Sequence, residues 1–216
     1  MTVSIELQME QMGQRAKKAA RVLSAAAPAA KTQALRALAA LLIERQPDIL
    51  KANALDVNAA KAANMDAPRL DRLTPRIMAD MADACLHVAE MADEVGVIEQ
   101  QWQRPNGLMI GKMRIPLGVI AMIFESRPNV TIDAAILCLK AGDAVILRGG
   151  SEAIRSNCAI MDALQEAAAA AGLPEGAVAL VRDPSRAAAN ELMRLNGLVD
   201  VLIPRGGEGL IRAVVE

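Results

Sequence analysis

The stretch that most constrains the fold covers residues 114–152, RIPLGVIAMIFESRPNVTIDAAILCLKAGDAVILRGGSE. Its apolar runs, 117–123 and 144–147, each end in a charged turn that contains Gly or Pro. Between them, four apolar residues follow the i, i+3, i+4, i+7 spacing of one helix face: Ile132, Ala135, Ile136 and Leu139. This pattern predicts a strand, a helix and a second strand of an open α/β sheet. Ligands of such sheets bind beyond the carboxyl ends of the strands, so we expect the chemistry in the turns ESRPN and RGGSE.

The chain repeats this alternation to its end. Strand-like runs lie at 117–123, 144–147, 177–181 and 199–203. Helical segments lie at 131–141, 153–171, 185–195 and from about 207 onward. Alternating strands and helices with short connections predict a parallel sheet with right-handed crossovers. We therefore expect residues 116–216 to form one βα-repeat core.

Residues 1–96 show helical patterning. One apolar face is formed by Ile5, Met9, Met12, Ala16, Ala19 and Leu23. A second helix is expected to stop before Pro47, and a third to cover about 48–63. Thr74 followed by Pro75 is a helix start signal, because a capping hydroxyl precedes a proline at the first helical position. His87 lies off the apolar stripe of that last helix, so we expect it on the surface.

Residues 97–115 have a different pattern. The β-like runs VIEQQWQ and LMIGKMRI flank Asn106-Gly107, a dipeptide that strongly favours a hairpin turn. The edges of an exposed hairpin are usually paired or covered. Trp102 is therefore expected in packing or at an interface rather than in an active site.

Composition excludes several classes of protein. The net charge of −1 disfavours a nucleic-acid surface, and no apolar stretch is long enough for a transmembrane helix. The N-terminus lacks the basic and apolar regions of a secretory signal, so we expect a cytoplasmic protein. Three cysteines, Cys85, Cys138 and Cys158, with a single His make neither a disulfide framework nor a metal site credible. We expect all three to be buried structural thiols.

The turn RGGSE follows a strand and opens a helix, where free backbone N–H groups favour an anion. Gly149 and Gly150 would let the backbone approach a ligand closely, and Arg148 could form a bidentate pair with phosphate. The alternative is a simple βα turn, and spacing alone leaves both interpretations open. A similar turn, RGGEG at 205–209, follows the strand 199–203 and favours one extended phosphate-bearing ligand. Neither turn is a GxGxxG fingerprint or a P-loop.

The turn ESRPN, residues 125–129, ends the first strand of the core. The side-chain amide of Asn129 could donate to a developing oxyanion, and Arg127 could bind an anionic substrate. The alternative interpretation makes Asn129 a helix cap beside Pro128.

The segment RIPLGVIAMIFESRPN resembles the R-x-P-x-G strand and Pro-x-Asn loop of the aldehyde dehydrogenase superfamily. LKAGDAVILRGGSEA resembles the A-A-G-N-x-V-V-L-K-P-A segment of that superfamily. The series ESRPNVTIDAA, CLK.G.AVILRGG.EA and DVLIPRGG is closer still to the branch that reduces L-glutamate 5-phosphate to the 5-semialdehyde in proline biosynthesis, with phosphate release. The resemblance implies a Rossmann-type parallel sheet flanked by helices, an N-terminal helical region and a small β oligomerisation arm at 97–115.

The resemblance also implies roles for individual residues. Asn129 matches the oxyanion-stabilising asparagine, with Ser126 and Arg127 beside it for the substrate. Arg148 matches a lysine that contacts the adenosine ribose, and Ser151 stands where many NAD-preferring members carry a glutamate, so NADPH is the implied cofactor. The full set implied for the cofactor is Arg148, Gly149, Gly150, Ser151, Glu152, Arg205, Gly206 and Gly207. A homo-oligomer and a functional coupling to glutamate 5-kinase are implied as well.

One feature departs from the superfamily. Its nucleophile is a cysteine in a catalytic domain that follows the cofactor domain, and none of the three cysteines here matches it. We expect that domain to lie beyond residue 216, and residues 1–216 alone to be inactive. The alternatives are a fragment of an NAD-dependent aldehyde-oxidising dehydrogenase, which ESRPN in place of P-W-N-F-P disfavours, and a stand-alone nucleotide-binding module.

Overall fold

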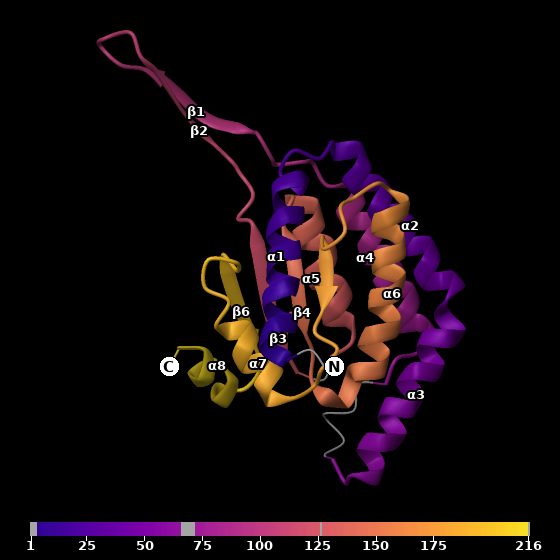
Figure 1. Cartoon of the computed structure of the whole chain (residues 1–216). Coiled ribbons are helices and arrows are strands. Elements are labelled where there is room, and N and C mark those ends of the chain that lie inside the picture. Colours follow the sequence, from indigo (N-terminus) through magenta and orange to yellow (C-terminus); the bar gives the residue numbers. More distant parts are fainter. Residues whose placement is uncertain (1–3, 66–71, 126, 216) are drawn as a thin grey trace.

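A computed structural model of the chain describes residues 4–65, 72–125 and 127–215. The fold is α/β, with a four-stranded parallel sheet between helical layers and a separate two-stranded hairpin (Figure 1). This confirms the expected fold class. Residue Ser126, one of the predicted substrate residues, lies outside the described residues.

The sheet consists of β3 (Val119–Phe124), β4 (Ala144–Arg148), β5 (Val178–Leu180) and β6 (Val201–Arg205). The strand order is β5-β4-β3-β6, and every neighbouring pair is parallel. In register, Ala121 of β3 lies opposite Ile146 of β4 and Leu202 of β6. β4 is almost wholly buried, as expected for a strand of a parallel sheet that is covered on both faces.

The strand order reverses once. From β3 the chain steps to β4 and then β5, and it then returns to place β6 on the other side of β3. The reversal therefore lies between β3 and β6. Ligands of open α/β sheets bind at such a switch point, beyond the carboxyl ends of the strands.

Helices cover both faces of the sheet. α5 (Asn129–Ala141) connects β3 to β4, and α6 (Ile154–Ala170) connects β4 to β5. α7 (Arg186–Met193) connects β5 to β6. Right-handed crossovers place α7 on the opposite face from α5 and α6. α1 (Ile5–Leu23) packs on that face beside α7. A further layer, α2 (Pro28–Glu44), α3 (Gln46–Ala62) and α4 (Pro75–Glu90), packs over α5 and α6.

Local signals account for the helix starts. Thr74 accepts a hydrogen bond from the Ile77 N–H at 3.2 Å, with Pro75 at the first helical position, as predicted. Ser4 caps α1 in the same way through the Leu7 N–H. α3 begins at Gln46 rather than after Pro47, which is a correction. A proline is tolerated there because the N–H it lacks would have no partner in the first turn.

β6 covers Val201–Arg205 and not 199–203, so Arg205 is the last strand residue instead of the first turn residue. Pro204 is accommodated because β6 is an edge strand among the described residues, and a proline at an edge leaves the sheet intact. α8 (Glu208–Val215) follows after only Gly206 and Gly207.

The hairpin β1 (Ile98–Gln103) and β2 (Met109–Met113) is antiparallel and projects away from the body (Figure 1). Gly107 supplies the positive φ of 87° at its turn. Its residues are nearly all exposed, and the Trp102 side chain is 43% exposed. Its strands carry exposed apolar side chains among polar ones, which favours an interface, and its role in oligomerisation stays a prediction.

Candidate functional site

The carboxyl ends of β3, β4 and β6 carry the predicted polar loops. Phe124, Arg148 and Arg205 are the last residues of these strands. The ESRPN and RGGEG loops flank the switch point between β3 and β6, and RGGSE follows the neighbouring β4. The fold thus brings the three loops to one edge of the sheet.

The loops after β3 and β6 contact one another directly. Glu125 Oε1 accepts a hydrogen bond from the Gly207 N–H at 3.2 Å. A Cβ atom on Gly206 would come within 2.9 Å of the Glu125 carboxyl, so this carboxyl lies directly against the Gly206–Gly207 turn. No local sequence pattern singles out Glu125, because its contact is with a residue 82 positions away.

Asn129 is the first residue of α5, and the N-cap position is Pro128 with no side-chain capping bond. The capping interpretation of Asn129 is therefore wrong. Its amide nitrogen instead donates to Asp133 Oδ2 at 3.4 Å, one helical turn further on. Burial raises the pKa of Asp133, and the nearby positive charge of Arg205 partly offsets this effect. Asp133 thereby joins the candidate site through Asn129, and the i, i+4 spacing between the two could have revealed it.

Arg127 is exposed, and its backbone N–H donates to the Glu125 carbonyl at 2.7 Å. Its guanidinium is open to an anionic group arriving at the loop.

Arg148 extends from the end of β4 toward the loop before α7. Its Nη2 donates to the Pro184 carbonyl at 2.8 Å, with the Ser185 carbonyl at 3.5 Å. Its Nε is buried and has no hydrogen-bond partner within the described ranges. Burial lowers the pKa of Arg148, while Glu152 and Asp183 act in the opposite direction. An unpaired buried donor costs free energy. A ligand oxygen that accepted a hydrogen bond from the Arg148 Nε would therefore bind favourably.

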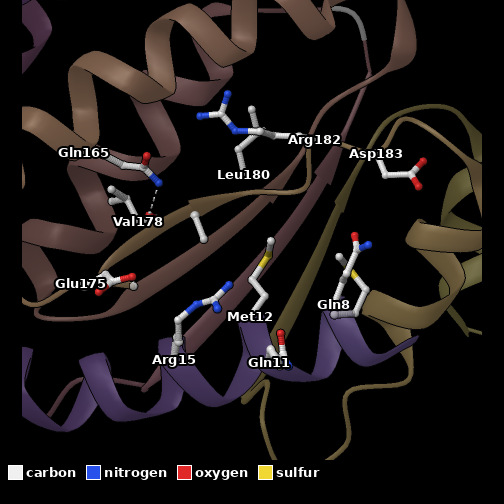
Figure 2. Close-up of a pocket in the computed structure, with 13 residues that line it drawn as sticks. Gln8, Gln11, Met12, Arg15, Gln165, Glu175, Val178, Leu180, Arg182 and Asp183 are labelled. Carbon is white, nitrogen blue, oxygen red and sulfur yellow. Dashed lines mark hydrogen bonds between the residues drawn. The ribbon is translucent and has the colours of Figure 1, made fainter. Parts of the chain in front are cut away.

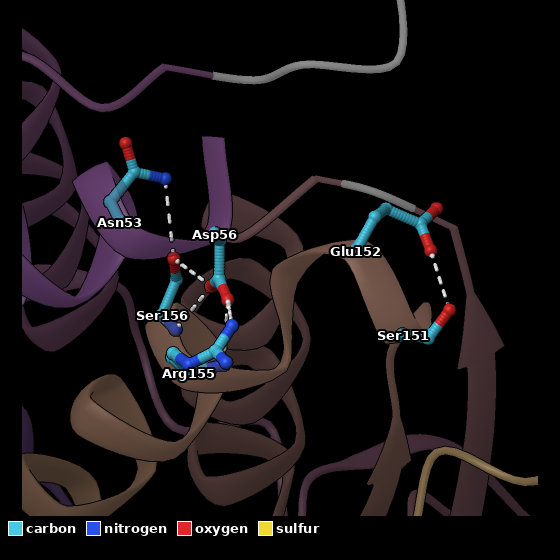
Figure 3. Close-up of polar contacts among 6 residues, drawn as sticks. All are labelled: Asn53, Asp56, Ser151, Glu152, Arg155 and Ser156. Atoms are coloured by element: carbon cyan, nitrogen blue, oxygen red, sulfur yellow. Dashed lines mark hydrogen bonds and ion pairs between the residues drawn. The ribbon is translucent and has the colours of Figure 1, made fainter. Parts of the chain in front are cut away.

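The glycines of RGGSE have different surroundings. A Cβ on Gly149 would lie 2.2 Å from Asn157 Nδ2, so tight packing inside the protein already requires glycine there. A Cβ on Gly150 would meet the Glu152 carboxylate at 2.5 Å. Ser151 Oγ lies 3.3 Å from that carboxylate (Figure 3). Gly150 therefore faces the Glu152 carboxylate at the predicted cofactor loop.

RGGSE does not open an α-helix directly, which corrects the expectation of free helix N–H groups. A 3₁₀ turn, η2 (Ser151–Ala153), comes first, and α6 starts at Ile154. The first turn of α6 is capped by Asp56 of α3, which accepts from the Ser156 N–H at 2.8 Å (Figure 3). A carboxylate of the protein therefore accepts from the N–H groups of Arg155 and Ser156 in the first turn of α6, which are not free for a ligand.

A cleft of about 500 Å³ opens elsewhere, between α1 and β5 (Figure 2). It is lined in part by Arg15 of α1 and by Gln165, whose amide donates to the Val178 carbonyl at 3.3 Å. None of the predicted site residues that the structure describes lines this cleft. Its mixture of opposite charges points to no particular ligand.

The cysteines have the surroundings of structural thiols. Burial raises the pKa of Cys85 and of Cys138 to about 12 in each case. The pKa of Cys158 is raised as well, and this side chain is half-buried rather than buried. A nucleophilic thiol needs a lowered pKa, so these environments do not activate any of the three.

No helix in the described parts of the chain has both the length and the apolar character needed to cross a membrane. No group of three or more His, Cys, Asp or Glu residues is arranged to hold a metal ion there. His87 is exposed, as predicted.

Three features fit a nucleotide cofactor beside an acyl substrate. They are Arg148 with its unpaired Nε, the Gly206–Gly207 turn, and Asn129 on α5. The guanidinium can bind a phosphate oxygen. A Cβ on Gly209, in the first turn of α8, would meet no atom within 4 Å, and a Cβ on Gly207 would meet only Glu125 Oε1, at 3.8 Å.

Comparison with known proteins gives consistent matches. The sequence model of the aldehyde dehydrogenase family matches residues 3–208. The gamma-glutamyl phosphate reductase of Desulfovibrio desulfuricans is 61% identical over 211 residues, which cover 97% of this chain and 50% of that protein. That of Nitratidesulfovibrio vulgaris strain DP4 is 62% identical over 216 residues, covering 99% and 52%. The chain spans about half the length of these curated relatives.

Solved structures agree with the sequence matches. The gamma-glutamyl phosphate reductase of Thermotoga maritima superposes with a TM-score of 0.92 at 37% identity, covering 96% of this chain and 50% of that one. The corresponding protein of Saccharomyces cerevisiae superposes with a TM-score of 0.88 at 27% identity, covering 94% and 52%.

Proposed function

Because this chain belongs to the aldehyde dehydrogenase family, we propose that it forms the cofactor-binding half of an NADPH-dependent reductase of L-glutamate 5-phosphate. The product would be L-glutamate 5-semialdehyde, with release of phosphate, in proline biosynthesis. The observation that carries the proposal is that the Asn129 loop and the Arg148 loop follow the neighbouring strands β3 and β4. An oxyanion donor and a phosphate-binding cation then share one edge of the sheet.

The cofactor contacts follow from the side chains at that edge. The Arg148 guanidinium would bind the 2′-phosphate of NADPH, because paired charge-assisted hydrogen bonds favour an Arg for this group. Ser151 is small and neutral, so it adds no charge that would repel the phosphate. The Gly206–Gly207 turn and the N-terminus of α8 would face the pyrophosphate. When bound, NADPH supplies the hydride for the reduction.

The substrate contacts lie at the neighbouring loop. The Asn129 amide would donate to the oxygen that becomes negative as the acyl carbon is attacked. Arg127 would bind an anionic group of the substrate. The attacking thiolate would come from outside these 216 residues, since burial raises the pKa of Cys85 and Cys138 to about 12 and raises that of Cys158 as well.

We propose a homo-oligomer as well, with the β1–β2 hairpin as its arm. The exposed Trp102 and Met109 side chains on this ribbon support this part of the proposal. A cytoplasmic location and the coupling to glutamate 5-kinase stay predictions.

Binding of NADP⁺ and NAD⁺ to Arg148→Ala tests the cofactor assignment by titration calorimetry. NADP⁺ binding should weaken by about 10- to 150-fold, the equivalent of one charge-assisted hydrogen bond, while NAD⁺ binding changes little. Arg148→Lys should keep part of the preference for NADP⁺, because a lysine retains the charge without the bidentate geometry. Arg76→Ala, an exposed position on α4, is the matched control. Equal losses for both dinucleotides would overturn the role in 2′-phosphate binding.

A further inference from the structure

The Glu125 carboxylate lies in the turn that the proposed function assigns to the cofactor pyrophosphate. Its Oε1 accepts from the Gly207 N–H at 3.2 Å, and its carboxyl would be 2.9 Å from a Cβ on Gly206. Glu125 itself is exposed and stands at the switch point, directly after β3. Nothing in the proposed chemistry requires a negative charge at this place.

A carboxylate and a phosphate compete for the same features of this turn. Both are stabilised by the unpaired N–H groups and the positive end of the dipole of α8. The Gly207 N–H is one of these donors, and Glu125 already accepts from it. Glu208, the other carboxylate of the turn, pairs with Arg212 at 2.6 Å. Glu125 is therefore the group that a phosphate at Gly207 must replace.

We propose that the Glu125 carboxylate is a built-in competitor for the phosphate position at Gly206–Gly207, and that cofactor binding displaces it. This rests on the proposed function for the identity of the cofactor. While no ligand is bound, the Glu125 side chain accepts a hydrogen bond from the Gly207 N–H before α8. It thereby lowers the affinity for pyrophosphate-containing ligands. Because Glu125 is exposed, its side chain can rotate away without disturbing the buried core.

The experiment compares the parent chain with Glu125→Gln and Glu125→Ala. Glu125→Gln keeps a hydrogen-bond acceptor and removes the charge, so it retains the contact with Gly207. The probes are inorganic pyrophosphate, NADP⁺ and adenosine 2′-phosphate. Their affinities come from titrations that follow the Gly207 amide resonance and the heat of binding.

We expect Glu125→Gln to bind pyrophosphate and NADP⁺ about two- to fivefold more tightly, as expected for one partly screened charge. The gain should shrink at high salt. Adenosine 2′-phosphate, which has no pyrophosphate, should bind the parent and the variant equally. Glu208→Gln removes the same charge from the same turn but from a residue paired with Arg212, and it should have a smaller effect.

Three outcomes would overturn the inference. They are unchanged pyrophosphate affinity in both Glu125 variants, an equal gain in Glu208→Gln, or a Gly207 amide that does not respond to pyrophosphate in any of the proteins. A lower melting temperature of Glu125→Ala with unchanged affinities would leave Glu125 as a cap of α8. A wrong cofactor assignment would be recognised separately, because Arg148→Ala would then change the affinities for NADP⁺ and NAD⁺ equally.

Discussion

The Asp56 carboxylate of α3 accepts hydrogen bonds from both the backbone N–H and the hydroxyl of Ser156, at 2.8 and 2.7 Å. The Arg155 N–H donates to its other oxygen at 3.3 Å. Asn53 donates to the same Ser156 hydroxyl at 3.2 Å, so the cap belongs to a buried polar network (Figure 3). This network fixes the start of α6 directly after the predicted cofactor loop.

Asp56→Ala should destabilise the fold by about 2–4 kcal/mol, because it removes a buried acceptor of several charge-assisted hydrogen bonds. Asp56→Asn should cost less, since its amide oxygen can still accept from one donor. Urea denaturation followed by far-ultraviolet circular dichroism measures both. Asp80→Ala, at an exposed position on α4, is the control and should change stability by less than about 0.5 kcal/mol. An equal loss in the two alanine variants would contradict the capping role.

Asp133 should lower the stability of the fold at neutral pH. Its pKa is raised by burial, so the folded chain binds more protons than the unfolded chain between the ordinary carboxyl value of about 4 and the raised value. Stability then falls as the pH rises through this window. Asp133→Asn should therefore be more stable than the parent at pH 7, and the difference should vanish near pH 3. A difference that is the same at both pH values would contradict this burial effect.

The sheet could be predicted from sequence because parallel strands buried on both faces appear as apolar runs. Leu147 and Ala121 belong to such runs, and β3 and β4 were located to within about two residues. β6 was placed two residues early because Val199 and Asp200 precede a strand in which Pro204 interrupts the apolar pattern.

The polar contacts between distant segments could not be predicted. Asp56 and Ser156 are 100 residues apart, and no local pattern links them. The same holds for Glu125 and Gly207. Such pairs depend on how α3 lies against α6, and on β3 lying beside β6, which only the assembled fold determines.

The three thiols should be unreactive in the native chain. With a pKa of about 12, Cys85 and Cys138 are about one part in ten thousand ionised at pH 8. A thiol reagent at pH 8 should therefore modify Cys158 slowly at most, and all three rapidly in urea. The chain alone should show no reductase turnover. Rapid labelling of Cys85 in the folded chain, or measurable turnover, would contradict the proposal that the nucleophilic thiolate lies outside these 216 residues.

Trp102→Ser should weaken self-association, because it removes the largest exposed apolar side chain of the hairpin. Multi-angle light scattering should show a shift toward the monomer at micromolar concentration. Leu55→Ser is the matched control, since Leu55 is 52% exposed on α3 and lies outside the hairpin. An unchanged mass for Trp102→Ser, or an equal shift in the control, would argue against the hairpin as the oligomerisation arm.

Asn129→Ala should lower kcat of the complete reductase by about 10²–10³-fold, equivalent to the roughly 2.7–4 kcal/mol that one oxyanion donor contributes. The affinity for NADP⁺ should not change, because Arg148 and Ser151 lie on another loop. Asp133→Asn tests whether Asp133 orients the Asn129 amide, since the Asp133 carboxylate accepts a hydrogen bond from this amide at 3.4 Å. This variant should show a smaller loss of kcat with a changed pH profile. An unchanged kcat for Asn129→Ala would leave the amide as a partner of Asp133 alone.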